Sequence, residues 1–116
     1  MVEQYIYNLL PSTLPKVIGD LPSTASNAVA IILYNGVSNL EYFQFDTVYK
    51  PVLKIVVRNQ SYEEAQQQIN DIRDALHKHT DEFFLSILMQ GYPVYLGRGE
   101  QKMHEFQIVF NIQVKE

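Results

Sequence analysis

The chain has 116 residues, of which 47% are hydrophobic and 19% charged, with a formal net charge of −4 and no cysteine. These values fit one globular domain over residues 1–116 and exclude a disulfide scaffold, a zinc finger and a thiol nucleophile. Because the sequence has no cluster of Lys or Arg, no apolar run near the ~20 residues that span a bilayer and no signal-peptide pattern, we expect no specific nucleic-acid binding, no membrane insertion and no secretion.

The first part of the chain combines a helix signal with a long loop. Apolar residues near helical spacing predict a short helix over Val2–Leu10, which Pro11 ends. Three prolines and several Ser and Thr residues predict a loop from Pro11 to Ser26. Loops of this length inside a compact domain are usually functional or mobile, so this loop is a candidate contact surface.

Strand signals follow the loop. The apolar stretch 27–34 predicts a strand, and Asn35-Gly36 supplies turn chemistry after it. Residues 42–48 alternate loosely and predict a second strand or part of a wide hairpin. Pro51–Arg58 predicts a more regular strand, because Leu53, Ile55 and Val57 alternate with a more polar set.

The clearest predicted element is an amphipathic helix from Ser61 to about His79. The Ser61 side chain can accept the backbone N–H of Glu64, and the Glu64 side chain can reach back to Ser61, which together would form a capping box. Five side chains fall within an arc of about 80° on this helix: Tyr62, Ala65, Ile69, Ile72 and Leu76. We expect this arc to pack on a sheet.

The last part of the chain predicts strands. Phe83–Met89 reads as a strand, Gly91-Tyr92-Pro93 interrupts it, and Val94–Leu96 continues it or pairs anew. Gly97-Arg98-Gly99 predicts a turn. Met103–Val114 alternates most regularly, with His104 and five apolar residues on one face and mainly Glu, Gln and Asn on the other.

This order of elements predicts an α+β fold. We expect a mostly antiparallel, mixed sheet with the long amphipathic helix and the short N-terminal helix packed on one face.

Few residues are placed for chemistry. His77 and His79 lie two apart on the predicted helix and so cannot share a metal ion, and the acidic residues mostly point to solvent. The stretch 97–102 (GRGEQK) lacks the spacing of a phosphate loop. We therefore predict no catalytic residue, no metal, no cofactor and no enzymatic activity. His104 and the acidic turn 79–82 are the only candidates for an alternative enzyme or ligand site.

Aromatic residues are a better signal than charged ones. The chain has 8 tyrosines and 6 phenylalanines, several of them, including Tyr49 and Tyr92, in predicted loops or edges. A tyrosine-rich surface that is poor in charge is typical of protein–protein contact, although the same rings could fill a small core.

Several short motifs occur in a familiar order. Tyr34-Asn35-Gly36 ends a strand, VVRNQSYEEA (56–65) leads into a helix with Ile69 and Leu76, and LGR (96–98) precedes the alternating strand FQIVFNIQV (106–114). In this order the chain resembles the tail terminator and minor capsid proteins of long-tailed bacteriophages and prophages, over nearly its whole length.

The resemblance implies a structural virion protein without catalytic residues. Its subunits would assemble as a homo-oligomer, commonly a hexameric ring, that caps the tail tube and meets the head-completion proteins. DNA would pass the lumen without specific binding, and the protein would occur in the virion and, during assembly, in the host cytoplasm. Arg58 and Arg98 match the family's V-R and L-G-R stretches, which implies ring-contact or structural roles; we expect Tyr49 and Tyr92 at the same interface. The family commonly has an acidic residue directly after L-G-R, where this chain has Gly99.

Two other classes of protein stay open at this point. One is a small α+β enzyme or ligand-binding domain, and the other is a non-viral homodimeric interaction module.

Overall fold

The computed structural model describes residues 2–22, 26–34, 48–98 and 103–115, and the structural statements below concern these residues. The elements in chain order are α1 (Val2–Leu9), β1 (Lys16–Ile18), β2 (Ala28–Tyr34), β3 (Val48–Tyr49), β4 (Val52–Asn59), α2 (Tyr62–Leu76), β5 (Phe84–Met89), β6 (Val94–Arg98) and β7 (His104–Lys115). The strands form one mixed sheet in which β1 and β2 are parallel and the other described pairs are antiparallel. The predicted α+β class is confirmed.

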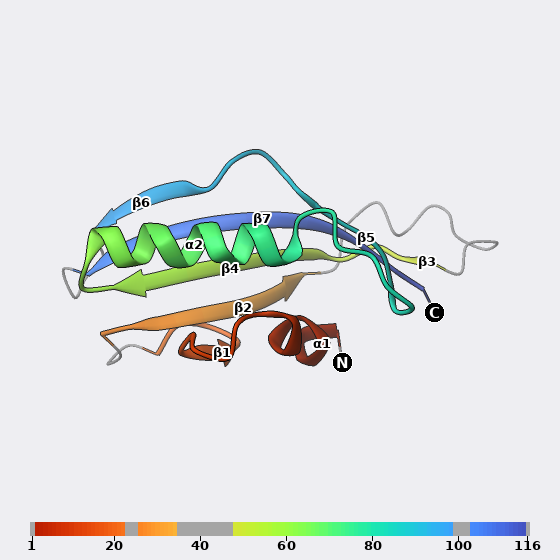
Figure 1. Cartoon of the computed structure of the whole chain (residues 1–116), viewed down its shortest axis with the longest axis horizontal. Coiled ribbons are helices and arrows are strands. Elements are labelled where there is room, and N and C mark those ends of the chain that lie inside the picture. Colours follow the sequence, from red (N-terminus) through yellow and green to blue (C-terminus); the bar gives the residue numbers. More distant parts are fainter. Residues whose placement is uncertain (1, 23–25, 35–47, 99–102, 116) are drawn as a thin grey trace.

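The long strand β7 organises this sheet. It pairs with β4 from His104 to Asn111 on one side, and β3 extends that side at Val114. On its other side β7 pairs with β6 near His104 and with β5 near Val114. The sheet therefore runs from β1 through β2, β4 and β7 to an outer edge shared by β5 and β6 (Figure 1).

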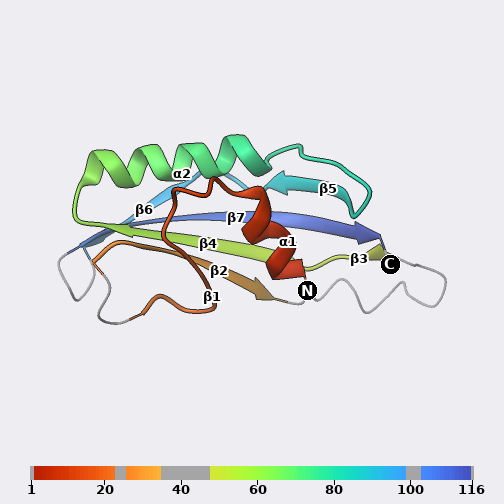
Figure 2. The same cartoon turned by 60° about the horizontal axis from the view of Figure 1, so that its bottom comes forward.

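Both helices cover the same face of the sheet (Figure 2). The apolar arc of α2 is buried at four of its five predicted positions, Ala65, Ile69, Ile72 and Leu76. The inward residues of α1 and of the central strands join it in one core. At about 25 cal/mol per Å² of apolar area, this burial is the main source of the fold's stability. The opposite face of the sheet carries no described helix, and we refer to it as the open face.

The predicted Pro11–Ser26 loop contains the short strand β1. β1 pairs in parallel with β2, so that Lys16 lies opposite Val29 and Ile18 opposite Ile31. The Lys16 ammonium group donates to the carbonyl oxygens of Tyr7 (3.0 Å) and Leu10 (3.2 Å), which lie at the end of α1. A cation at a helix C-terminus stabilises carbonyls that have no partner within the helix. The prediction of an irregular loop is therefore wrong for residues 16–18.

The start of α2 keeps half of the predicted capping box. The backbone N–H of Glu64 donates to the Ser61 hydroxyl oxygen at 3.2 Å. The backbone N–H of Ser61, however, donates to the side-chain oxygen of Asn59 at 2.9 Å, in place of the predicted Glu64 carboxylate. Asn59 is 1% exposed, and it holds this position because its amide group is bonded on both sides, to Ser61 and to the Gln68 side chain.

The helix ends at Leu76 and not near His79 as predicted. Lys78 adopts a left-handed conformation with φ of 69°, which an α-helix cannot continue through. The backbone N–H of Lys78 donates to the Ile87 carbonyl at 2.7 Å, and that of Met89 donates to His77 Nδ1 at 2.9 Å. Bonds to β5 therefore replace the helical bonds at this point.

The predicted turn at 97–99 is also corrected in part. Gly97 and Arg98 belong to β6 and lie opposite Glu105 and His104, and a bulge separates Tyr95 from Gly97. Gly97 has φ of 91°, which explains why a glycine occupies the bulge. The predicted turn at 35–36 and most of the predicted strand at 42–48 lie outside the described residues.

Candidate functional site

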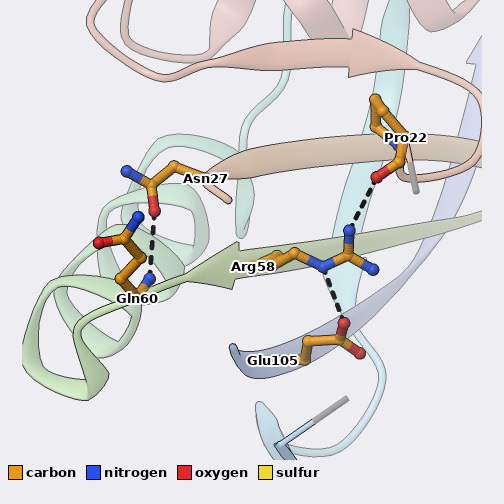
Figure 3. A network of polar contacts seen from close by, with 5 residues as sticks. All are labelled: Pro22, Asn27, Arg58, Gln60 and Glu105. Carbon is orange, nitrogen blue, oxygen red and sulfur yellow. Dashed lines mark hydrogen bonds and ion pairs between the residues drawn. The ribbon is translucent and has the colours of Figure 1, made fainter. Parts of the chain in front are cut away.

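Arg58 lies where three segments of the chain meet. Its Nε–H donates to Glu105 Oε2 at 2.9 Å, across the pairing of β4 with β7 (Figure 3). A terminal nitrogen of the guanidinium donates to the Pro22 carbonyl oxygen at 2.8 Å. The side chains of Arg58 and Glu105 are only 12% and 17% exposed. The described contacts of Arg58 are thus contacts within one chain.

Contacts at the end of β4 hold two described residues of the segment between β1 and β2. Pro22 belongs to that segment, and so does Asn27, whose side-chain oxygen accepts the backbone N–H of Gln60 at 3.1 Å (Figure 3). Arg58 and Gln60 therefore hold the segment at two places, both at the end of β4. The part of the candidate loop near Pro22 has a fixed position next to the sheet.

The other three predicted interface residues are spread over the molecule. Arg98 is exposed at the end of β6 and lies opposite His104. His104 directly precedes Glu105 on β7, so Arg98 lies near the Arg58–Glu105 pair. Tyr92 is 82% exposed in the connection from β5 to β6. The backbone of Tyr49 lies opposite Val114, at the far end of β7. The structure brings Arg58 and Arg98 to one end of the sheet and places Tyr49 at the other. The interface roles of all four residues stay predictions.

The alternative chemical site does not assemble. His104 begins β7 and its Nδ1 lies 2.8 Å from the Tyr95 hydroxyl, in a group of rings that includes Tyr62 and Phe106. The acidic turn 79–82 precedes Phe84, which lies opposite Val114. Ten residues of extended β7 separate these positions, which corresponds to about 33 Å. His104 and the acidic turn therefore cannot act on one substrate atom.

The acidic turn has a structural explanation of its own. The Asp81 carboxylate accepts the backbone N–H groups of Phe83 and Phe84, both at 2.8 Å, and lies 2.7 Å from His79 Nε2. The hydrogen bond from Phe84, with smaller contributions from His79 and Phe83, lowers the pKa of Asp81 below its ordinary value of 3.8, against an opposing effect of burial. The turn borders an open groove of about 480 Å³ next to the stacked rings of Tyr5 and Phe83. Nothing in this arrangement is specific to a reaction.

The described residues give no sign of a metal site or of a membrane-spanning helix. These residues contain no group of three or more His, Asp or Glu side chains that could hold a metal ion. None of the helices in the same ranges is long and apolar enough to cross a bilayer.

Three consecutive exposed apolar residues lie along β6. Val94, Tyr95 and Leu96 are 52%, 40% and 48% exposed, and Tyr92, two residues before Val94, is 82% exposed. Tyr62, at the start of α2, is 41% exposed and contacts the Tyr95 ring edge-on. The prediction that Tyr62 joins the core was therefore only partly right. A row of exposed apolar side chains on an outer strand indicates a surface for another protein.

The sequence did not reveal the partners of Arg58. Glu105 is the only acidic residue on the polar face of β7, so a pairing with a basic residue of a neighbouring strand could have been guessed. The register that brings Glu105 opposite Arg58 could not, because it depends on how β4 and β7 pair across 47 residues of chain. The Pro22 carbonyl gave no sequence signal at all.

Comparison with known proteins gives a consistent result. The model of a family described as "Bacteriophage tail terminator protein" matches residues 5–116. No curated protein matches the chain. Among solved structures, a chain from a structure titled "Virion of native gene transfer agent (GTA) particle" has a TM-score of 0.69 and 15% sequence identity, over 96% of this chain and 92% of that one. At this identity, the likeness to the virion chain shows a shared fold.

Proposed function

Because this chain belongs to the bacteriophage tail terminator family, we propose that it assembles into a closed ring, a hexamer, that ends the tail tube of a phage or prophage. The family is one of phage structural proteins and not of enzymes, so the function rests on assembly. The ring would meet the tail tube protein on one side and a head-completion protein on the other. The observation that carries the proposal is the family match, which spans all but the first four residues.

The charge of the chain supports a passage for DNA. A formal net charge of −4 and the lack of a Lys or Arg cluster give no means of neutralising several phosphates at once. A lumen built from such subunits would let the genome pass without holding it. The site of action is the virion, at the tail or the head–tail joint, and assembly takes place in the host cytoplasm.

The described surfaces are compatible with a ring. A closed ring needs two different patches on each subunit, because each contact is head to tail. The exposed apolar residues of β6 lie on both faces of one edge strand and form an apolar patch along that edge, and the opposite edge of the sheet, at β1, carries Ile18 at 48% exposure. Arg98 and Tyr92 lie next to the first patch in sequence and are exposed, so we keep both as interface residues.

Light scattering after size-exclusion chromatography, together with negative-stain imaging, tests the ring. Six subunits of 13.5 kDa would give a particle of about 81 kDa with a central hole. The measurement is repeated in the presence of purified tail tubes, because some rings form only on their partner. A chain that stays monomeric both alone and with tubes, and that does not bind tube ends, would contradict the proposal.

A further inference from the structure

The two outer strands β1 and β6 have a described partner strand on one side only. We propose that β6 of one subunit pairs antiparallel with β1 of the next subunit, so that the sheet continues around the ring. This inference rests on the ring proposed above and identifies the two surfaces that meet.

β6 has the properties of a strand that accepts a partner. No described strand pairs with the backbone groups on its free side, and Val94, Tyr95 and Leu96 are 40–52% exposed. Outer strands are usually protected by lysine, proline or a bulge. Here Pro93 and the bulge before Gly97 lie at the two ends of the exposed stretch and leave Val94–Leu96 accessible. That stretch has three residues, as does β1 (Lys16–Ile18).

Along the direction of the strands, β6 lies at the same position as β1, whereas β5 does not. The residue partners of successive strands form one row across the sheet, Val17, Ala30, Val56, Gln107 and Val94. β5 shares the outer edge with β6, but its Leu88 lies opposite Asn111, four residues further along β7. Four residues of extended chain correspond to about 13 Å. Without a large stagger between subunits, β1 of a neighbour therefore meets β6.

The direction of the strands fixes the sense of the pairing. β1 runs parallel to β2, β2 antiparallel to β4, β4 antiparallel to β7, and β7 antiparallel to β6. β1 and β6 therefore run in opposite directions within one subunit, at opposite edges of the sheet (Figure 1). A rotation about an axis along the strands keeps these directions, so β6 and the neighbouring β1 are antiparallel. This is the sense that gives the better hydrogen bonds.

The row of partners also predicts which side chains meet. Val94 of one subunit comes opposite Val17 of the next, with both side chains on the open face, since both belong to a row that alternates with the core residues. A pair of β-branched side chains opposite each other contributes roughly 0.2–1 kcal/mol in a sheet. Three residues of pairing alone bury too little for a stable dimer, because specific interfaces bury about 1,200–2,000 Å². The strand pairing therefore sets the register between neighbouring subunits. Neighbouring exposed residues such as Tyr92 add to the area buried in the interface.

The lack of native cysteine makes a cross-linking test direct. In the full chain, Val17→Cys and Val94→Cys are combined, assembled with tail tubes, and oxidised. Within one subunit the two positions are four strand spacings apart, about 19 Å, which is too far for a disulfide. We expect linked dimers up to closed hexamers on a non-reducing gel. The matched control combines Val17→Cys with Leu88→Cys, which lies on the same outer edge and is 45% exposed, and we expect few linked species from it.

The possible outcomes separate the two proposals. Rings that form without cross-links in the Val17/Val94 variant would overturn the strand pairing and leave the ring intact. A failure of the unmodified chain to form rings or to bind tube ends would overturn both. If the cysteine variant does not fold, a second pair of substitutions tests the same contact. Val17→Glu and Val94→Lys should each reduce assembly, whereas the double variant should restore it through an ion pair between subunits. Equal loss in the single and double variants would overturn the pairing.

Discussion

Arg58 Nε donates to Glu105 Oε2 at 2.9 Å, and the two residues lie directly opposite each other in the pairing of β4 with β7. Because both side chains are largely shielded from water, removing one leaves the other without its charge partner. Arg58 also holds the Pro22 carbonyl, so the pair connects the centre of the sheet to the segment between β1 and β2.

We expect Arg58→Met, which keeps most of the apolar stem, to lower the free energy of unfolding by about 2 kcal/mol. Urea unfolding measures the loss, and hydrogen exchange should show faster opening near Gly19–Pro22. Arg73→Met is the control, because the Arg73–Asp74 pair is 37% and 70% exposed and should contribute less than about 0.5 kcal/mol. Normal stability with lost assembly would instead assign Arg58 to the ring interface, as the family resemblance allows.

Asn59 is expected to matter more than Glu64 for the start of α2. Asn59→Ala removes the acceptor of the Ser61 N–H and leaves buried polar groups unpaired, which should cost about 1–3 kcal/mol. Glu64→Ala removes a charge near the helix N-terminus and any side-chain contact with Ser61, and should cost less, about 0.3–1 kcal/mol. Thermal unfolding of both variants orders the two effects. A larger loss for Glu64→Ala would support the capping box that the sequence predicts.

Protonation of the Asp81 carboxylate should make the fold less stable at acidic pH. Its pKa is lower in the folded chain than the ordinary value of 3.8, chiefly because the Phe84 N–H stabilises the carboxylate. Its contribution is therefore complete above about pH 5 and is lost as the pH falls through the lowered pKa. Wild type and Asp81→Asn should differ in stability at pH 6 and converge as the pH falls below the lowered pKa of Asp81. Glu82→Gln, which also removes one negative charge from this turn, controls for net charge. A difference that persists unchanged at low pH would contradict the assignment.

Lys78 is expected to be a site where glycine stabilises. With φ of 69° it lies in a region that costs an L-residue roughly 1–2 kcal/mol, whereas glycine enters it freely. Lys78→Gly should raise the free energy of unfolding by about 0.5–1 kcal/mol, after its larger entropy in the unfolded chain is subtracted. Lys78→Ala keeps the strain and should not stabilise. Chemical denaturation of the two variants gives the comparison, and equal stabilities would contradict strain at this residue.

The elements with strong periodicity could be predicted from the sequence. The alternation of β7 and the apolar arc of α2 placed both within about three residues, and the three residues predicted to share a face of β4, Leu53, Ile55 and Val57, are all buried. β1 could not be predicted, because three residues carry no period and its pairing with β2 depends on tertiary contacts. The end of α2 was missed for a related reason, since Lys78 takes a conformation usually reserved for glycine.

The candidate site was predictable only as a set of residue types. The family resemblance and the tyrosine content led to Arg58 and exposed tyrosines as interface candidates, and these roles stay predictions. The sequence could not place β6 at an outer edge, because the choice between continuing β5 and pairing anew depends on the length of β7. That choice determines which apolar side chains face outward.

The position of β7 in the chain also has a consequence for synthesis. β3, β4, β5 and β6 all pair with residues 104–115, which leave the ribosome after every one of them. β5 and β6 have no other described strand to pair with, so their backbone groups stay unpaired until those last residues are available. Contacts between distant parts of a chain slow folding, here to an expected range of about milliseconds to seconds. A nascent subunit therefore cannot present a finished β5–β6 edge to its neighbours before residues 104–115 have been synthesised and have paired.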